Sequence, residues 1–107
     1  MIQIPLTEPV LLLLLSLADQ PRHGYSILKD VATMSGGRVQ LSTGTLYGAL
    51  QRLLNQSWIE RFEENESTRD RRAYRLTSRG RRNLRAEVER MRHLTKLAGL
   101  RIARREA

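Results

Sequence analysis

Residues 42–54 read STGTLYGALQRLL, and this stretch decides the fold of the chain. It opens with hydroxyl residues, which are suited to capping the start of a helix. The leucines behind them recur at helical spacing, so at about 100° per residue they form a single apolar stripe. The members of the stripe are Leu46, Leu50, Leu53 and Leu54. The sequence therefore predicts an amphipathic helix that follows a cap at Ser42 and ends near Gln56.

The face of this helix opposite the leucines is unusual because it carries Gly44 and Gly48. Each glycine costs a helix roughly 1 kcal/mol relative to alanine, which suggests that a partner approaches the backbone closely. The major groove of DNA admits a helix and is read by side chains such as those of Gln51 and Arg52. An ordinary core helix with small residues on its outer face explains the same pattern. The stretch alone leaves both interpretations open.

Composition places the chain among globular proteins of one domain. It has 107 residues, of which 40% are hydrophobic and 28% are charged. Cysteine is absent, which excludes disulfides, a thiolate nucleophile and Cys-based zinc sites. The longest apolar run, residues 10–18, is shorter than the 20 or so residues of a membrane span, and no basic residue precedes it as in a signal peptide. We therefore expect a cytoplasmic protein without membrane contact.

The charge of the chain indicates a polyanionic partner. The net charge is +8, and residues 81–107 hold nine basic residues against three acidic ones. All 19 basic residues other than Lys29 and Lys96 are arginines, the better of the two side chains for bidentate recognition of phosphate and bases. Basic tails also occur for solubility, so charge supports nucleic-acid binding without deciding it.

Two helices are expected before the opening stretch. Residues 9–18 predict a buried helix, because their run of leucines leaves no polar face. Residues 23–35 predict a second helix, which Gly36 and Gly37 end. We expect four residues on its inner face: Tyr25, Leu28, Val31 and Ala32.

The periodicity changes to that of strands after the third helix. Residues 58–63 and 72–76 alternate as strands do, and the polar segment 64–71 between them indicates a hairpin with a charged tip. The fold class is therefore mainly α with a small β-hairpin, in the layout of a winged helix-turn-helix. We expect a DNA-binding domain in residues 1–77, with the wing at about 58–76.

The rest of the chain, residues 78–107, predicts a long C-terminal helix capped by Thr77 or Ser78. Its apolar residues follow a coiled-coil spacing, which on a terminal helix needs a partner, and the leucine-rich first helix needs cover as well. We therefore expect this helix to dimerise the protein. The predicted dimerisation residues are Leu11, Leu12, Leu15, Leu84, Val88, Met91, Leu94, Ala98 and Ile102.

Four segments together carry a resemblance to a known family. They are residues 23–25 (HGY), 42–53, 58–60 (WIE) and 71–77 (RRAYRLT), the last followed by Gly80. In this order and spacing they resemble the PadR-like transcriptional regulators, in the branch with a single C-terminal helix. Thr43 departs from the family pattern, which usually has proline at this position.

The resemblance implies that the helix of the opening stretch is the recognition helix. Near its start, Thr43 and Thr45 are suited to phosphate. Gln51 and Arg52 are candidates for base edges, or for phosphate if the helix enters the groove end-on. Tyr25 and Tyr47 are candidates for contact with backbone phosphate, and the alternative for both is core packing. The loop arginines are candidates for the minor groove or phosphate, and their alternative role is to balance the charge of nearby glutamates. The candidate DNA-binding residues are Tyr25, Ser42, Thr43, Gly44, Thr45, Tyr47, Gly48, Gln51, Arg52, Arg69, Arg71 and Arg72.

We accordingly expect a transcriptional regulator that binds double-stranded operator DNA as a homodimer, as a repressor released by a ligand or signal. The alternative is a winged-helix module that binds a protein through its acidic wing. The sequence shows no nucleophile elbow and no paired acids, so catalysis is not expected, and neither is a cofactor. His23 and His93 are far apart in a chain without cysteine, so no metal site is expected.

A small-molecule effector has no predicted identity. Relatives can bind aromatic or planar compounds near the dimer interface, and some stack them on a tryptophan of the last helix. Here residues 78–107 contain no aromatic residue, so we do not expect a stacking pocket built from that helix.

Overall fold

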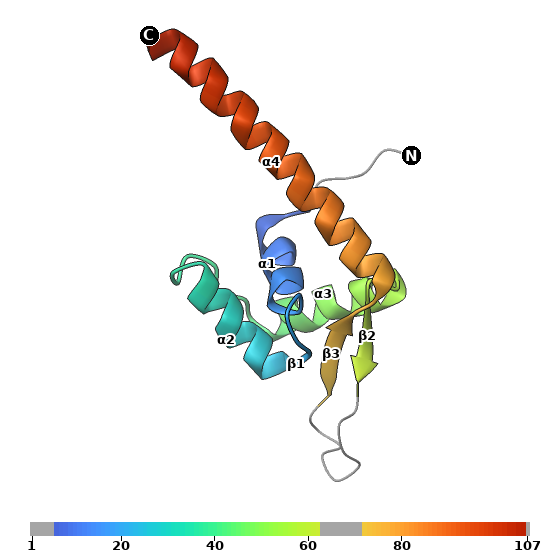
Figure 1. Cartoon of the computed structure of the whole chain (residues 1–107). Coiled ribbons are helices and arrows are strands. Elements are labelled where there is room, and N and C mark those ends of the chain that lie inside the picture. Colours follow the sequence, from blue (N-terminus) through green and yellow to red (C-terminus); the bar gives the residue numbers. More distant parts are fainter. Residues whose placement is uncertain (1–5, 63–71, 107) are drawn as a thin grey trace.

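Four helices and a small antiparallel sheet make up the described part of the chain, residues 6–62 and 72–106 of a computed structural model. In chain order the elements are α1 (Glu8–Ser16), β1 (Arg22–His23), α2 (Gly24–Met34), α3 (Thr43–Asn55), β2 (Ile59–Phe62), β3 (Ala73–Leu76) and α4 (Ser78–Glu106). Figure 1 shows α1, α2 and α3 gathered beside the sheet, with α4 extending away from them. The predicted fold class is confirmed.

The sheet has three strands in the order β1-β3-β2, so the hairpin is present and a third strand joins it. Arg61 of β2 lies opposite Tyr74, and Arg22 of β1 lies on the other side of Tyr74. The sequence analysis missed β1 because two residues are too few to show an alternating pattern. Arg22 anchors this strand, since its Nε donates to the Ser16 carbonyl at 2.7 Å and its guanidinium lies 3.6 Å from the carboxylates of Asp19 and Asp30.

The core lies between the three short helices and the inner face of the sheet. Its buried members come from every element except β1: Leu13, Leu14, Leu17, Ile27, Val31, Leu46, Ala49, Leu50, Leu53, Ile59, Tyr74 and Leu84. The leucine-rich α1 is only partly covered, because Leu11, Leu12 and Leu15 stay half-buried at the edge of this core.

The inner face of α2 differs from the expected one. Ile27 and Val31 are fully buried, whereas Tyr25 is 70% exposed. Val31 is buried as expected and Leu28 packs against the core, so the expectation was wrong at Tyr25. Two apolar spacings fit this helix, and the one that starts at Gly24 is buried because glycine lets α3 approach α2 closely.

Both predicted caps are present. The Ser42 hydroxyl accepts a hydrogen bond from the Thr45 amide at 3.1 Å, which caps α3. The Thr77 hydroxyl accepts from the Gly80 amide at 3.0 Å at the start of α4. A Cβ atom at Gly80 would overlap the carbonyl oxygen of Trp58, so α4 starts in backbone contact with the segment that leads into β2.

The loop between α2 and α3 is tied back to α1 by an ion pair of Arg38 with Glu8. The hydrogen bond from this guanidinium lowers the pKa of the Glu8 carboxyl below its ordinary value. The pair links this loop to the first residue of α1 at the surface of the molecule.

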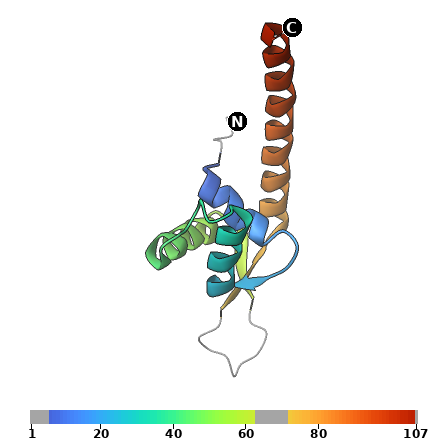
Figure 2. The ribbon, with the colours of Figure 1, turned by 90° about the vertical axis from the view of Figure 1, so that its left-hand side faces the viewer.

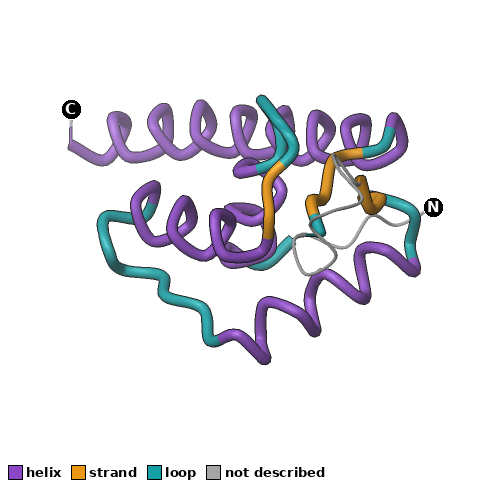
Figure 3. Tube along the Cα trace, turned by 90° about the horizontal axis from the view of Figure 1, so that it is seen from below, coloured by secondary structure: helices purple, strands orange, loops and turns teal. Residues whose placement is uncertain are grey.

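The helix α4 contains 29 residues and is therefore about 43 Å long, more than twice the length of the 13-residue α3. Figure 2 shows it rising clear of the other elements. Figure 3, seen from below, places α3 and α4 on opposite sides of the molecule. The outer face of α3 consequently points away from α4.

One predicted dimerisation residue, Leu84, belongs to the core of its own protomer, where it is 6% exposed. This assignment is corrected, because the first turns of α4 pack against the sheet and α1 before the helix leaves the body. Val88 is also packed against this core, though only partly buried.

Candidate nucleic-acid interface

The outer face of α3 is polar and open to solvent. Thr43, Gly44, Gln51 and Arg52 are all exposed on it. A Cβ atom at Gly44 or at Gly48 would meet no atom within 4 Å, so neither glycine is required by packing inside the protein. The structure thus leaves this face free for an external partner, as the sequence analysis expected.

The hydroxyl residues at the start of α3 differ in their contacts. The Ser42 hydroxyl donates to Thr45 Oγ1 at 2.9 Å while it caps the helix, so both side chains are engaged within the protein. Thr43, one residue into the helix, is exposed. Further along, the amide nitrogen of Gln51 donates to Asn55 Oδ1 at 3.1 Å, which orients the Gln51 side chain on the outer face.

Two tyrosines lie beside this face. Tyr47 on α3 is 49% exposed, and its hydroxyl lies against the backbone of Gly24, where a Cβ atom would be only 2.7 Å from it. Tyr25 lies on α2 with the Lys29 ammonium 5.2 Å from the centre of its ring. Tyr25 therefore has no core-packing role, and Tyr47 has a partial one.

The wing carries one of the three predicted arginines within the described residues. Arg72 is exposed at the start of β3, whereas Arg69 and Arg71 lie outside the described residues. On the outer face of the hairpin, Arg75 Nε donates to Glu60 at 2.7 Å, and its guanidinium lies 4.7 Å from the centre of the Phe62 ring. Arg75 is therefore already paired with side chains of the wing itself.

The sequence analysis missed Arg61. In an antiparallel strand alternate residues share a face, so Arg61 lies on the same side of β2 as the buried Ile59. At the C-terminal end of β2 this inner face becomes open to solvent, and the Arg61 side chain is exposed there. The alternation that predicted the strand could have identified it.

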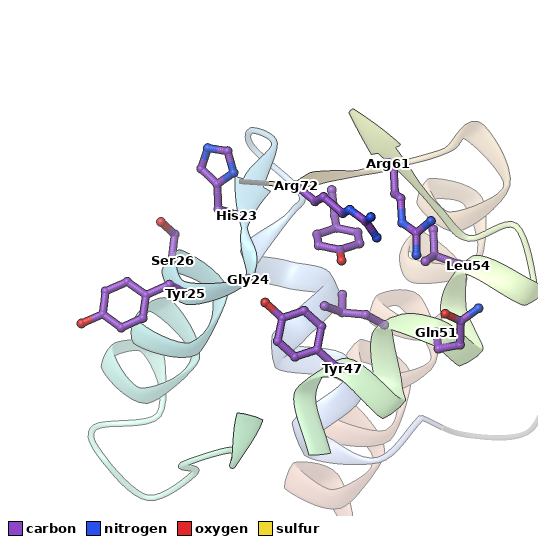
Figure 4. A pocket seen from close by; sticks show the side chains of 11 residues that line it. His23, Gly24, Tyr25, Ser26, Tyr47, Gln51, Leu54, Arg61 and Arg72 are labelled. Carbon is purple, nitrogen blue, oxygen red and sulfur yellow. The ribbon is translucent and has the colours of Figure 1, made fainter. Parts of the chain in front are cut away.

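A cavity of about 460 Å³ collects side chains from α2, α3 and the sheet. Figure 4 shows Tyr47 and Gln51 on one wall, with the guanidinium groups of Arg61 and Arg72 reaching over them from the sheet. The lining residues are His23, Gly24, Tyr25, Ser26, Tyr47, Leu50, Gln51, Leu54, Arg61, Arg72 and Tyr74. Four of the predicted DNA-binding residues therefore lie together around one concave surface.

The distal part of α4 presents an apolar face without cover in the protomer. Met91 is half-buried, and every described residue beyond it is exposed. Leu94 is 46% and Ile102 is 56% exposed, with Ala98 between them. Leu97 and Leu100, which are also exposed, widen the face.

Within residues 6–62 and 72–106, no cluster of three His, Asp or Glu side chains could hold a metal ion. In the same ranges, none of the helices combines the length and the apolar character that a membrane crossing requires.

Comparison with known proteins places this arrangement in a family. A family model described as the transcriptional regulator PadR-like family matches residues 12–86. An uncharacterized 37.1 kDa protein of transposon TN4556 from Streptomyces fradiae is 39% identical over 85 residues, which cover 79% of this chain and 23% of that protein. This chain thus spans about a quarter of the length of that relative.

Solved structures agree on the fold. A PadR family transcription regulator from Clostridium difficile R20291 has a TM-score of 0.74 and 24% identity, over 90% of this chain and 99% of that chain. Bacillus subtilis PadR in complex with operator DNA has a TM-score of 0.64 and 20% identity, over 74% of this chain and 45% of that chain. Because the family model matches residues 12–86, well over half of the chain, the chain belongs to the PadR-like family of transcriptional regulators.

Proposed function

We propose that the chain is a homodimeric, sequence-specific DNA-binding regulator that acts as a repressor in the cytoplasm. The observation that carries this proposal is the outer face of α3, where Gly44 and Gly48 leave the backbone open and polar side chains surround them. A helix with this face can approach the floor of a major groove closely, and Gln51 and Arg52 would then reach base edges. The operator-bound Bacillus subtilis PadR gives a precedent within the same fold.

The wing and the start of α3 would hold the DNA backbone. Thr43 lies near the helix N-terminus, where amide groups favour phosphate, and Arg72 supplies a guanidinium from the sheet. Such contacts fix the position of the protein on the duplex without reading sequence. Specificity would come from the outer face of α3.

Dimerisation is proposed from the apolar face of α4, because Leu94 and Ile102 are roughly half exposed in the protomer. Residues 78–107 would then form the dimerisation part, with residues 1–77 as the DNA-binding domain. A dimer would present two copies of α3 to two half-sites of an operator. Release by a ligand or signal completes the proposal, since a repressor needs a means to leave its operator.

The test is footprinting on the DNA upstream of the protein's own gene, followed by fluorescence polarisation with the protected duplex at several salt concentrations. We expect a protected site and an affinity that falls steeply as salt rises. Little affinity for any duplex would contradict the proposal and favour a protein-binding module.

Arg72→Ala gives a second readout of the same proposal. The variant should bind all duplexes more weakly and lower the salt slope by about one unit, because one phosphate contact is lost. A change in sequence preference instead would show that Arg72 reads a groove.

A further inference from the structure

The cavity between α2, α3 and the sheet has features that the approach of a groove does not require. It is a concave space of about 460 Å³ beside the proposed recognition face, large enough for a small organic molecule. Its two walls come from segments far apart in the chain, α2 with α3 on one side and the sheet on the other (Figure 4).

The polar part of the cavity is suited to an anion. The guanidinium groups of Arg61 and Arg72 line it, and no Asp or Glu is among its lining residues in the described part of the chain. Arginine binds phosphate through charge-assisted, often bidentate hydrogen bonds. Arg61 of β2 and Arg72, the residue before β3, converge here (Figure 4), which favours a doubly charged head group over a singly charged one.

The start of α2 adds further donors to the same space. His23 is the N-cap residue of α2, and its side chain makes no capping hydrogen bond. The first amide groups of the helix, from Gly24 to Ser26, therefore lack a side-chain acceptor, and these residues line the cavity. Tyr47 closes this end with its hydroxyl against Gly24. The helix N-terminus and the two arginines thus surround one volume.

The floor of the cavity is apolar, unlike its rim. Leu50 is 1% exposed and Leu54 is half-buried, and the ring of Tyr74 closes the space on the sheet side. A bare inorganic anion would leave this floor without contact. A ligand with an anionic head and an apolar body would satisfy both parts.

We propose that this cavity binds an organic phosphate monoester, whose dianionic head lies between Arg61, Arg72 and the start of α2. The apolar body of the ligand packs on the apolar floor at Leu54. Because Tyr47, Gln51 and Arg72 also belong to the proposed DNA face, a bound ligand and DNA exclude each other. This competition rests on the proposed function, whereas binding of the ligand to the free protein does not.

The first experiment is isothermal titration calorimetry of the full chain, without DNA, at constant ionic strength. The probes are phenyl phosphate and inorganic phosphate. We expect one phenyl phosphate per protomer, bound about tenfold tighter than inorganic phosphate because of the apolar floor. No measurable binding of phenyl phosphate, or equal affinity for both probes, would overturn the proposal.

Two arginines on the same strand pair supply a matched comparison. Arg61→Gln should weaken phenyl phosphate binding about tenfold or more, through the loss of a charge-assisted hydrogen bond. Arg75→Gln removes the same charge from the outer face of the hairpin, where Arg75 is paired with Glu60, and should leave binding unchanged. Equal losses in both variants would show general charge attraction rather than a site.

The second experiment adds operator duplex. Phenyl phosphate should raise the apparent Kd for DNA in the wild type and have at least tenfold less effect in Arg61→Gln. Binding of phenyl phosphate without displacement of DNA would overturn the competition. If Arg61→Gln weakens DNA binding while phenyl phosphate does not bind, the cavity holds a backbone phosphate of DNA and the free-ligand proposal is wrong. A wild type that binds phenyl phosphate but no duplex would contradict the proposed function alone.

Discussion

At the scale of single residues, Glu87 on α4 is a buried carboxylate with only part of its hydrogen-bonding capacity used. Its side chain is 1% exposed, and its Oε1 pairs with Arg90, which is 39% exposed. Its Oε2 has no hydrogen-bond partner in the described part of the chain. Desolvation of a charged group is costly, so this residue weakens the packing of α4.

Glu87→Met tests this cost. The change removes the buried charge and leaves Arg90 with access to water, so we expect the free energy of unfolding to rise by about 1 kcal/mol in a denaturant titration. Glu89→Met is the control, because the ion pair of Glu89 with Arg92 is solvent-exposed and the change should stay within about 0.5 kcal/mol. A destabilised Glu87→Met protein would contradict this and show that the buried carboxylate and its ion pair with Arg90 contribute net stability.

At the scale of elements, the start of α4 depends on a close approach of backbones. Gly80 lies against the Trp58 carbonyl, while Thr77 Oγ1 donates to the Ser57 carbonyl at 2.6 Å. These contacts fix the direction in which α4 leaves the sheet. The direction in turn sets where the apolar face of α4 points.

Gly80→Ala should therefore destabilise the protein although alanine is the better helix former. We expect a loss of about 1–3 kcal/mol in thermal or denaturant unfolding, because the new methyl group collides with backbone. Gly99→Ala in the same helix meets nothing within 4 Å and should gain up to about 1 kcal/mol. Equal effects of the two substitutions would refute the close approach.

The sequence predicted an element well where its side chains follow a clear helical or alternating pattern. The leucine stripe of α3, its Ser42 cap and the two wing strands were all evident from the spacing. The strand β1 was not, because Arg22 and His23 pair with β3 through backbone hydrogen bonds that no side-chain pattern records. The exposed position of Tyr25 was also missed, since Gly24 and Tyr25 can both start the apolar spacing of α2 and only the packing of Gly24 against Tyr47 decides between them.

The candidate site was predictable to the extent that it lies on one helix. The exposed face of α3 follows from its own sequence. The cavity does not, because Arg61 and Arg72 reach it from a sheet whose position relative to α2 depends on tertiary packing.

At the scale of the whole molecule, the protein divides into a packed body and a projecting helix (Figure 1). The body contains the core, whereas α4 beyond Met91 has only exposed residues in the described part of the chain. A free helical segment of roughly 15 residues, such as residues 92–106, is marginal in water, so a partner for its apolar face would stabilise it. The predicted partner is the α4 of a second copy.

Leu94→Asp combined with Ile102→Asp should break this dimer while the body stays folded, because both side chains are exposed in the protomer. Light scattering should find twice the chain mass of 12.4 kDa for the wild type and a single chain mass for the variant. Lys96→Asp, outside the apolar face, should remain a dimer. A wild type that is monomeric at micromolar concentration would contradict the proposed assembly.

The claim that α3 enters the groove of DNA is tested most directly at Gly48. Gly48→Leu adds a bulky side chain where the free protein has open space, so the melting temperature should stay equal or rise. In the complex the same side chain would stand between helix and groove floor. Gly48→Ala is the matched control, with most of the helix stabilisation and little of the bulk.

Both variants are measured for melting temperature and operator affinity on the same preparations. We expect Gly48→Leu to melt at or above the wild-type temperature and to lose at least tenfold in operator affinity, with Gly48→Ala close to wild type. A Gly48→Leu protein that melts normally and binds operator as the wild type does would show that this face of α3 does not enter the groove.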